Sequence, residues 1–513
     1  MKYLILVILL LAQQTYSQRC SVEGSDRKDC GKVGSTQETC EKSGCCWNPS
    51  PNKDQQNSFF TQILAYFYGD EDDNYPYCFY PQNICEEYNF TPVGTEIFPD
   101  DWFDGMYDRY FDNINVLGNG GVCAAPGMGA ETAGSYFYHW MRDGALTMRS
   151  FMELNDNDFS KIKYNMNKYV SWVENVQHKT DPNGINILID PKFVIQTRTP
   201  FTGGWCRPQT DGPGLRSGTL IKYAQIQLKN QGSIDEDLYK AIYTDLNWLV
   251  GGWETFGCDL WEDIESDNFF WNRMSFYQSL TWGAELAENQ GNSDSAQKYK
   301  DTAAQILPTI LAHFNGSFIA ESENRPWDGA VIHALSELNE GVFDLTGKEV
   351  AKTIDQLNNL FCTTFPINQI DDDNKIPGIL YGRYKGDVYA GGNPWQLLTA
   401  VLAETFYKAA QDTLDKKVDK LEESEVKHWR KMLKIEEQFV SSNQLAKKLQ
   451  NAGTAVMERL WHHTNADDYM ISEQIDKFNG EQISALDLTW SYANILTVLK
   501  QYTHNESYLN QFE

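Results

Sequence analysis

Apolar residues recur at helical spacing along most of the chain beyond residue 100. In the last such segment they follow the i, i+3, i+4, i+7 pattern of an amphipathic helix, at Tyr492, Ile495, Leu496 and Leu499. A second pattern starts after Asn393-Pro394, which predicts an N-cap residue with proline at the first helical position. About a dozen helices are predicted in all. The remaining ones lie near 137–153, 159–177, 214–230, 234–251, 270–289, 294–314, 326–338, 347–363, 418–437 and 442–461.

Long loops rich in Gly, Pro, Trp and Asp connect these predicted helices. Loops of this length are usually either functional or disordered, and their aromatic content favours function. The pattern therefore predicts an all-α domain whose chemistry lies in its loops.

One stretch approaches the hydropathy of a membrane span, and it lies at the N-terminus. Lys2 provides a positive start, and the apolar run from Tyr3 to Ala12 has the length of a signal sequence rather than of a bilayer span. We expect a signal peptide at 1–17, cleaved before Gln18; an uncleaved anchor is the alternative. The mature protein is then secreted or delivered to a lysosome or vacuole lumen, with no membrane span.

The charge balance narrows the classes of partner. The 513 residues include 43 Lys and Arg against 71 Asp and Glu, a formal net charge of −28. Phosphate groups would be repelled, so we expect no nucleic-acid partner. The acidity suits a compartment of low pH, where protonation eases self-repulsion, and this predicts an acid-side activity optimum. The alternative is that the acidity serves solubility alone.

The eleven cysteines are unevenly distributed. Six of them lie between Cys20 and Cys78 in a polar segment, which predicts a small disulfide-stapled module; their spacing leaves about 15 connectivities open. The odd total implies at least one free thiol or an intermolecular bond. Among the rest we predict a Cys206–Cys258 bond and an unpaired Cys362, and leave Cys85 and Cys123 unassigned.

The cysteine-rich segment resembles the trefoil (P-type) domain. The likeness is carried by Cys45-Cys46-Trp47 and by Cys78-Phe79-Tyr80-Pro81. It implies a trefoil domain at 18–82, here with an insertion that includes the acidic run 70–73. It also implies the bonds Cys20–Cys46, Cys30–Cys45 and Cys40–Cys78. The module could bind glycans or could protect the chain from proteolysis, and the sequence leaves both open.

Several common chemistries have no sequence support. There is no G-x-S-x-G elbow and no H-E-x-x-H pair, and the acidic run 371–373 lacks the glycine of a calcium loop. We therefore expect no metal and no cofactor. Three N-x-S/T sequons, at Asn89, Asn315 and Asn505, are expected to be glycosylated in an exported protein.

Five loop regions combine carboxylates, arginines and aromatic residues. They are 136–143, 204–213, 259–263, 382–395, and 472–474 together with 488–492. Aromatic faces stack on the apolar face of a pyranose, and Arg and Asp form charge-assisted hydrogen bonds to hydroxyls. Two carboxyl groups can share glycosidic cleavage, one donating a proton and one taking a proton from water. Aromatic and charged residues also occur together at ordinary helix ends, which is the alternative.

These regions are similar, in order and over roughly residues 100–505, to glycoside hydrolase family 15, the glucoamylases. The resemblance implies an (α/α)6 barrel of twelve helices at 83–513, with an active site in loops at one end. It implies Glu262 as general acid and Glu473 as general base. Cys206 departs from the glycine common in the family at that position. The implied substrate-binding residues are Tyr136, Trp140, Arg142, Asp143, Trp205, Arg207, Asp263, Arg383, Trp395 and Trp490. For Arg207, the alternative is that it only braces its loop.

The resemblance implies exo-acting, inverting hydrolysis of α-1,4-glucosidic bonds from the non-reducing ends of maltodextrin, starch or glycogen, with release of β-D-glucose. We expect a monomer that acts on an α-glucan. One alternative is a related α-glucosidase acting on trehalose or α-1,6 glucans. The other is a non-catalytic carbohydrate-binding scaffold, which the presence of both Glu262 and Glu473 disfavours.

Overall fold

A computed structural model describes residues 20, 36–42, 46–47, 77–79, 89–94, 97–126 and 136–509. The predicted signal peptide, the acidic run 70–73 and the predicted Cys30–Cys45 bond lie outside these residues. The chain divides into two compact units, Met1–Glu87 with Cys362–Asn374, and Tyr88–Phe361 with Lys375–Glu513. None of the described helices is both long enough and apolar enough to cross a bilayer.

The smaller unit is held by disulfides. The bonds Cys20–Cys46 and Cys40–Cys78 are both present, which confirms two of the three bonds that the trefoil resemblance implies. Cys40 and Cys78 are buried and pack with Trp47. The described elements of this unit are α2 (Gln37–Lys42), β1 (Cys46–Trp47), β2 (Cys78–Phe79), antiparallel to β1, and α13 (Pro366–Asp373).

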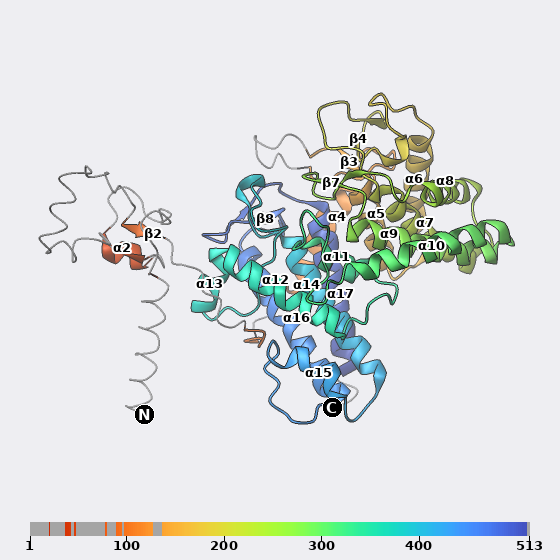
Figure 1. The fold of residues 1–513 in the computed structure, drawn as a ribbon. Coiled ribbons are helices and arrows are strands. Elements are labelled where there is room, and N and C mark those ends of the chain that lie inside the picture. Colours follow the sequence, from red (N-terminus) through yellow and green to blue (C-terminus); the bar gives the residue numbers. More distant parts are fainter. Residues whose placement is uncertain are drawn as a thin grey trace, which may run out of the picture. The chain divides into compact units, whose positions relative to one another are not determined.

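The larger unit is built around a closed ring of six inner helices (Figure 1). Each inner helix packs against the next, and the sixth packs against the first. The ring consists of α5 (Met141–Leu154), α7 (Asp211–Gln231), α9 (Phe270–Asn289), α11 (Ala330–Glu337), α14 (Gln396–Lys416) and α17 (Thr489–Leu509).

A second set of six helices alternates with the inner set along the chain. These are α4 (Asp100–Asp112), α6 (Phe159–Gln177), α8 (Glu236–Gly252), α10 (Ser293–Ala312), α12 (Lys348–Thr364) and α16 (Ser442–Thr464). Burial separates the two sets: α10 buries one stripe at helical spacing, whereas α14 is buried on all sides from Gln396 to Tyr407. A helix that is surrounded by others must be buried all round. The predicted (α/α)6 barrel is confirmed.

Several predicted helix boundaries are wrong; α5 and α11, for example, each begin four residues later than predicted. Helix α14 begins at Gln396 with Trp395 as its N-cap, not at Asn393-Pro394. The reason is that the Asn393 side chain donates hydrogen bonds to Ala390 O and Gln474 Oε1 in the preceding loop, at 2.8 and 3.0 Å. The predicted helix at 418–437 is reduced to α15 (Glu423–Arg430), followed by turns.

Short strands strengthen the loops that precede the inner helices. β3 (His139–Trp140) leads directly into α5 and pairs with β4 (Lys192–Val194), which pairs with β5 (Thr199–Pro200) before α7. The pair β6 (Gly257–Cys258) and β7 (Glu265–Ser266) precedes α9, and the pair β8 (Gln474–Ile475) and β9 (Gln482–Ile483) precedes α17. At one end of the barrel, short strands therefore hold several of the loops that lead into the inner helices.

The cysteine and sequon predictions have mixed outcomes. The Cys206–Cys258 bond is confirmed, but Cys362 is disulfide-bonded, so its prediction as unpaired is wrong. Among the described residues the free thiol is the buried Cys123. Asn505 is fully buried in α17, and its amide nitrogen donates to Tyr407 O and Gln450 Oε1, so an oligosaccharide cannot be attached there. Asn315 is exposed, and glycosylation of Asn89 and Asn315 stays a prediction.

Candidate active site

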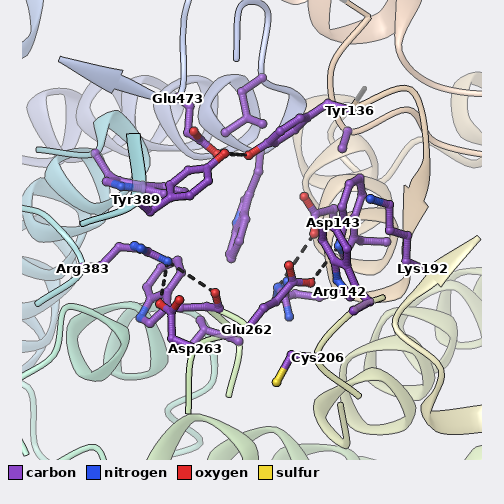
Figure 2. Close-up of a pocket in the computed structure, with 18 of the residues that line it drawn as sticks. Tyr136, Arg142, Asp143, Lys192, Cys206, Glu262, Asp263, Arg383, Tyr389 and Glu473 are labelled. Carbon is purple, nitrogen blue, oxygen red and sulfur yellow. Dashed lines mark hydrogen bonds and ion pairs between the residues drawn. The ribbon is translucent and has the colours of Figure 1, made fainter. Parts of the chain in front are cut away.

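A cavity of about 350 Å³ lies where the loops before the inner helices meet (Figure 2). Its volume is in the range of small-molecule sites. All the predicted substrate-binding and catalytic residues except Arg207 line it. The further lining residues are Ala124, Lys192, Gly204, Cys206, Leu260, Trp261, Tyr389 and Leu488.

Glu262 lies in the loop between β6 and β7, on one side of the cavity (Figure 2). Its backbone φ is 68°, in the left-handed region that costs a non-glycine residue about 1–2 kcal/mol. Its Oε1 accepts two hydrogen bonds, from Trp140 Nε1 and Gln209 Nε2, both at 2.9 Å. Because Oε1 is occupied by N–H donors, the proton of the neutral acid belongs on Oε2.

The loop that carries Glu262 is held by a buried carboxylate. Asp259 is fully buried, and its Oδ1 accepts hydrogen bonds from the backbone N–H groups of Asp263 and Ile264, at 2.8 and 3.1 Å. Its Oδ2 pairs with Arg325. These contacts hold Glu262 in its strained backbone conformation, as expected for a functional site.

Glu473 lies on the other side of the cavity, in the loop after α16 (Figure 2). Oε1 accepts from the Tyr136 hydroxyl at 3.0 Å, and Oε2 accepts from the Ser484 hydroxyl and from Gln474 Nε2. Burial raises the pKa of Glu473 to about 7, although the Ser484 and Tyr136 hydrogen bonds and the Arg383 charge oppose this rise. The two carboxyl groups therefore differ: N–H donors hold Glu262, and mainly hydroxyl donors hold Glu473.

Two arginines complete the polar wall. Arg142, in the first turn of α5, donates to Gln209 Oε1 at 3.0 Å and to Asp211 Oδ2 at 3.2 Å. Its neighbour Asp143 is buried, and burial raises the pKa of Asp143 to about 6. Arg383 bridges Asp387 and Asp263, with 2.9 Å between Arg383 NH1 and Asp263 Oδ2. Both guanidinium groups are thus fixed before any ligand binds.

Two known families match parts of the chain. Residues 113–500 match the glycosyl hydrolases of family 15, and residues 20–81 match the trefoil (P-type) domain. The chain belongs to glycosyl hydrolase family 15. It is therefore a glycoside hydrolase that carries an N-terminal trefoil segment.

Named relatives agree with this assignment. This family 15 hydrolase is 30% identical to the glucoamylase of Blastobotrys adeninivorans over 435 residues, which cover 75% of this chain and 68% of that one. It is 32% identical to glucoamylase-1 of Schizophyllum commune over 392 residues, 71% of this chain and 66% of that one. In fold it is similar to the glucoamylase of Saccharomycopsis fibuligera, with a TM-score of 0.70, 24% identity, and coverage of 81% of this chain and 98% of that one.

Tryptophans form most of the apolar wall of the hydrolase cavity. Trp261 lies 5.4 Å from Trp395 and 6.2 Å from Trp490 between ring centroids, and Trp140 lies 5.9 Å from Trp205. Within the described part of the chain, three of these indole N–H groups are buried without a hydrogen-bond partner, those of Trp205, Trp395 and Trp490. Buried donors rarely stay unpaired. Hydroxyl groups of a bound sugar would supply the missing acceptors.

For Arg207, the structure favours the predicted bracing role over substrate binding. Its guanidinium does not line the cavity; it donates to Phe201 O at 2.7 Å and to Gly203 O at 3.0 Å, and lies 3.4 Å from Asp190. Arg207 therefore braces the loop that presents Trp205, and it is not available to contact substrate.

Four residues of the site were not predicted from the sequence: Lys192, Gln209, Tyr389 and Ser484. Lys192 is 3% exposed, and its Nζ lies 3.6 Å from the Trp205 ring centroid and 4.3 Å from that of Trp140. Burial lowers the pKa of Lys192 to about 8. A lone lysine in a short strand gives no sequence signal. Gln209 lies within a region that was recognised, but its role depends on its contact with Glu262, which only the fold reveals.

The disulfide Cys206–Cys258 joins two walls of the site. It connects the loop of Trp205 to the strand that precedes Glu262, across a sequence separation of 52 residues. A backbone hydrogen bond of 2.8 Å from Cys258 N to Pro208 O runs beside it. The bond therefore restrains the loop that presents Glu262 relative to the loop that presents Gln209, which donates a hydrogen bond to Glu262.

Proposed function

We propose that this family 15 hydrolase removes glucose from the non-reducing ends of α-1,4-glucans with inversion at the anomeric carbon. The observation that carries the proposal is the pair of carboxyl groups on opposite sides of an aromatic cavity, Glu262 and Glu473 (Figure 2). Each sits among different hydrogen-bond donors, as the acid and the base of such a pair require.

In the proposed mechanism, Glu262 protonates the bridging oxygen through Oε2 as the bond from that oxygen to the anomeric carbon breaks. Glu473 accepts a proton from a water molecule that attacks the anomeric carbon from the opposite ring face. Inversion needs about 6.5–9.5 Å between the carboxyl groups to leave room for this water. Arg142, Asp143 and Arg383 hold the sugar hydroxyls with charge-assisted hydrogen bonds.

The anomer released tests the proposal. Proton NMR of a maltose digest should at first show β-glucose above its equilibrium proportion, because the non-reducing unit is released as the β anomer while the reducing-end unit keeps its own anomeric mixture. Slow mutarotation should then remove this excess. Isomaltose and trehalose in parallel decide between the α-1,4 activity and the alternative linkages. An early excess of α-glucose over its equilibrium proportion, or no hydrolysis of any of the three sugars, would contradict the proposal.

Lys192 supplies a cation that no described oxygen engages through a hydrogen bond. Its Nζ faces four rings, those of Tyr138, Trp140, Phe201 and Trp205. We expect it to donate to a sugar hydroxyl. Lys192→Met keeps the length of the side chain and removes the donor. A hydrogen bond to a charged group is worth about 1.5–3 kcal/mol, so KM for maltose should rise about tenfold or more. An unchanged KM would exclude Lys192 from substrate binding.

Loss of a donor to Glu473 should move the pH profile. The base must be ionised, so kcat/KM falls as the pH drops through the pKa of Glu473. Ser484→Ala and Tyr136→Phe each remove a hydrogen bond to the carboxylate, and should move the acid limb of kcat/KM up by about 1 pH unit. Tyr138→Phe is the control. An acid limb that stays in place or moves to lower pH would contradict Glu473 as the base.

The acid-side optimum predicted from composition stays a prediction. The burial that raises the pKa of Glu473 to about 7 argues against it, since the base then loses its charge at mildly acidic pH. The pH dependence of kcat/KM of the unmodified enzyme decides whether the optimum lies on the acid side, as composition predicts, or at higher pH, as the burial of Glu473 predicts.

Export and assembly remain part of the proposal. The predicted signal peptide at 1–17 and the three described disulfides suit an oxidising compartment, which supports secretion or a lysosome or vacuole lumen. We propose domain limits of 18–82 for the trefoil and 83–513 for the barrel, and a monomeric enzyme. The choice between glycan binding and protection from proteolysis for the trefoil stays open.

A further inference from the structure

Six loops lie at the active-site end of the barrel, one before each inner helix. Five of them contribute residues that line the cavity. The sixth, residues 313–329 before α11, is described throughout and contributes none. Because it precedes an inner helix as the other five do, it lies at the same end of the barrel.

This sixth loop presents a tryptophan to solvent. Trp327 is 45% exposed, and it is the one tryptophan among the exposed large apolar side chains of the described residues. Its ring stacks on Phe318, with 5.4 Å between centroids and 24° between planes. Phe318 covers one face of the indole, so the exposure belongs to the remaining face and edges. The exposed side chains of Glu323 and Asn324 lie in the same loop.

The residue that follows Trp327 packs behind the cavity wall. Asp328 is fully buried and accepts a hydrogen bond of 2.8 Å from Nε1 of the cavity residue Trp261. Its backbone pairs with Tyr384, whose hydroxyl donates to Asp263 at 2.7 Å. Consecutive Cα atoms are about 3.8 Å apart. Trp327 is therefore fixed on the outer side of the wall that Trp261 forms on the inside.

Contacts of Arg325 also connect the segment that carries Trp327 to Asp263 in the cavity wall. Arg325 lies 2.6 Å from Asp328 and 3.9 Å from Asp263, with its guanidinium 4.1 Å from the Tyr384 ring centroid. The Asp263 side chain is 34% exposed, whereas Arg142, Arg383 and Glu473 are buried. Asp263 is therefore one of the exposed residues of the cavity wall, and Arg325 links it to the segment that carries Trp327.

We propose that Trp327, backed by Phe318, is an outer subsite for an α-glucan chain whose non-reducing end occupies the cavity. This inference rests on the proposed function. A flat ring with one open face offers the apolar face of a glucosyl unit a stacking surface, and the carboxylate and amide of Glu323 and Asn324 offer partners to its hydroxyls. Maltose is too short to leave the cavity, so the subsite should favour long substrates over short ones.

The test is a chain-length series. We would measure kcat/KM of the full-length enzyme on maltose, maltotetraose and maltoheptaose for the unmodified chain and for Trp327→Ala. An aromatic contact is worth about 0.5–1.5 kcal/mol, so the ratio of maltoheptaose to maltose kcat/KM should fall about two- to tenfold. Trp327→Phe should keep most of the ratio. Tyr164→Ala, an exposed aromatic on the outer helix α6, is the matched control.

A ratio equal to that of the unmodified enzyme would overturn the proposal. That would be the result if Trp327 instead packed against an oligosaccharide on Asn315 of the same loop. Calorimetry in a Glu262→Gln background gives a second measurement: Trp327→Ala should weaken maltoheptaose binding, and equal affinity would also overturn the proposal. If the unmodified enzyme hydrolysed neither maltose nor maltoheptaose, the proposed function would be refuted instead. The binding comparison would still decide on the role of Trp327.

Discussion

Glu262→Gln should lower kcat on maltose by about 10²–10⁴-fold while leaving the dissociation constant of maltose nearly unchanged. The amide cannot donate a proton to the bridging oxygen, but its Oε1 still accepts the hydrogen bonds from Trp140 and Gln209. The side chain therefore keeps its position, and the cavity keeps its shape. Steady-state kinetics with maltose and calorimetry with the same sugar measure the two quantities.

The leaving group offers a sharper test of the role of Glu262. α-Glucosyl fluoride releases fluoride, which needs no proton from a general acid, so Glu262→Gln should hydrolyse it far better than maltose relative to the unmodified enzyme. Glu265→Gln, an exposed carboxylate in β7, is the matched control. Equal losses on both substrates would show that the variant is damaged for another reason. Near-normal maltose hydrolysis would remove Glu262 from the mechanism.

Most helices could be predicted from the sequence because the spacing of apolar residues reflects burial, whereas their closure into a barrel was implied only by the resemblance to family 15. An outer helix such as α10 buries one stripe, and an inner helix such as α14 is buried on every side, with a few polar residues among the apolar ones. The start of α14 could not be placed, because Asn393 has two possible roles, as an N-cap or as a donor to Gln474, and a contact 81 residues away decides between them. The segment 418–437 forms only the short helix α15, although residues on both sides of that helix, such as Leu421 and Leu433, are also buried.

The candidate site was predictable where its residues cluster in short motifs. Glu262 follows Trp261, and Arg142 precedes Asp143, so the chemistry is visible in a few adjacent letters. Lys192 and Ser484 are single residues in ordinary surroundings, and only the fold brings Lys192 to Trp205 and Ser484 to Glu473. Arg207 failed in the opposite way. Its motif was recognised, but carbonyl groups of its own loop occupy its guanidinium.

The disulfides also show which features could be predicted from the sequence and which could not. Cys206 and Cys258 were paired correctly, and the fold explains the pair through strand β6 and the loop beside it. Cys362 lies in α12 within a segment that clusters with the N-terminal unit, and no local pattern could indicate that it is bonded. Pairing is thus readable from sequence only when both cysteines belong to motifs that are already placed together.

Glu473→Ala should also lower kcat on maltose by about 10²–10⁴-fold, but α-glucosyl fluoride should not restore it. The missing step is removal of a proton from water, which a better leaving group does not supply. Azide needs no such proton transfer and could enter the space left by the carboxylate. With α-glucosyl fluoride it should attack the anomeric carbon as fluoride leaves, giving β-glucosyl azide. Glu481→Gln, an exposed carboxylate eight residues on, is the control.

A stability measurement checks the same residue independently of turnover. Burial raises the pKa of Glu473 from 4.5 to about 7, so the folded protein holds this proton more tightly than the unfolded chain does. The stability of the unmodified enzyme should therefore fall as the pH rises from about 4.5 to 7. Between pH 4 and pH 8, the unmodified enzyme should lose about 3 kcal/mol of unfolding free energy through this group. The Glu473→Ala variant lacks the carboxyl group and should not show this loss. A difference that does not vary with pH, together with an α-configured azide product, would remove Glu473 from the role of buried base.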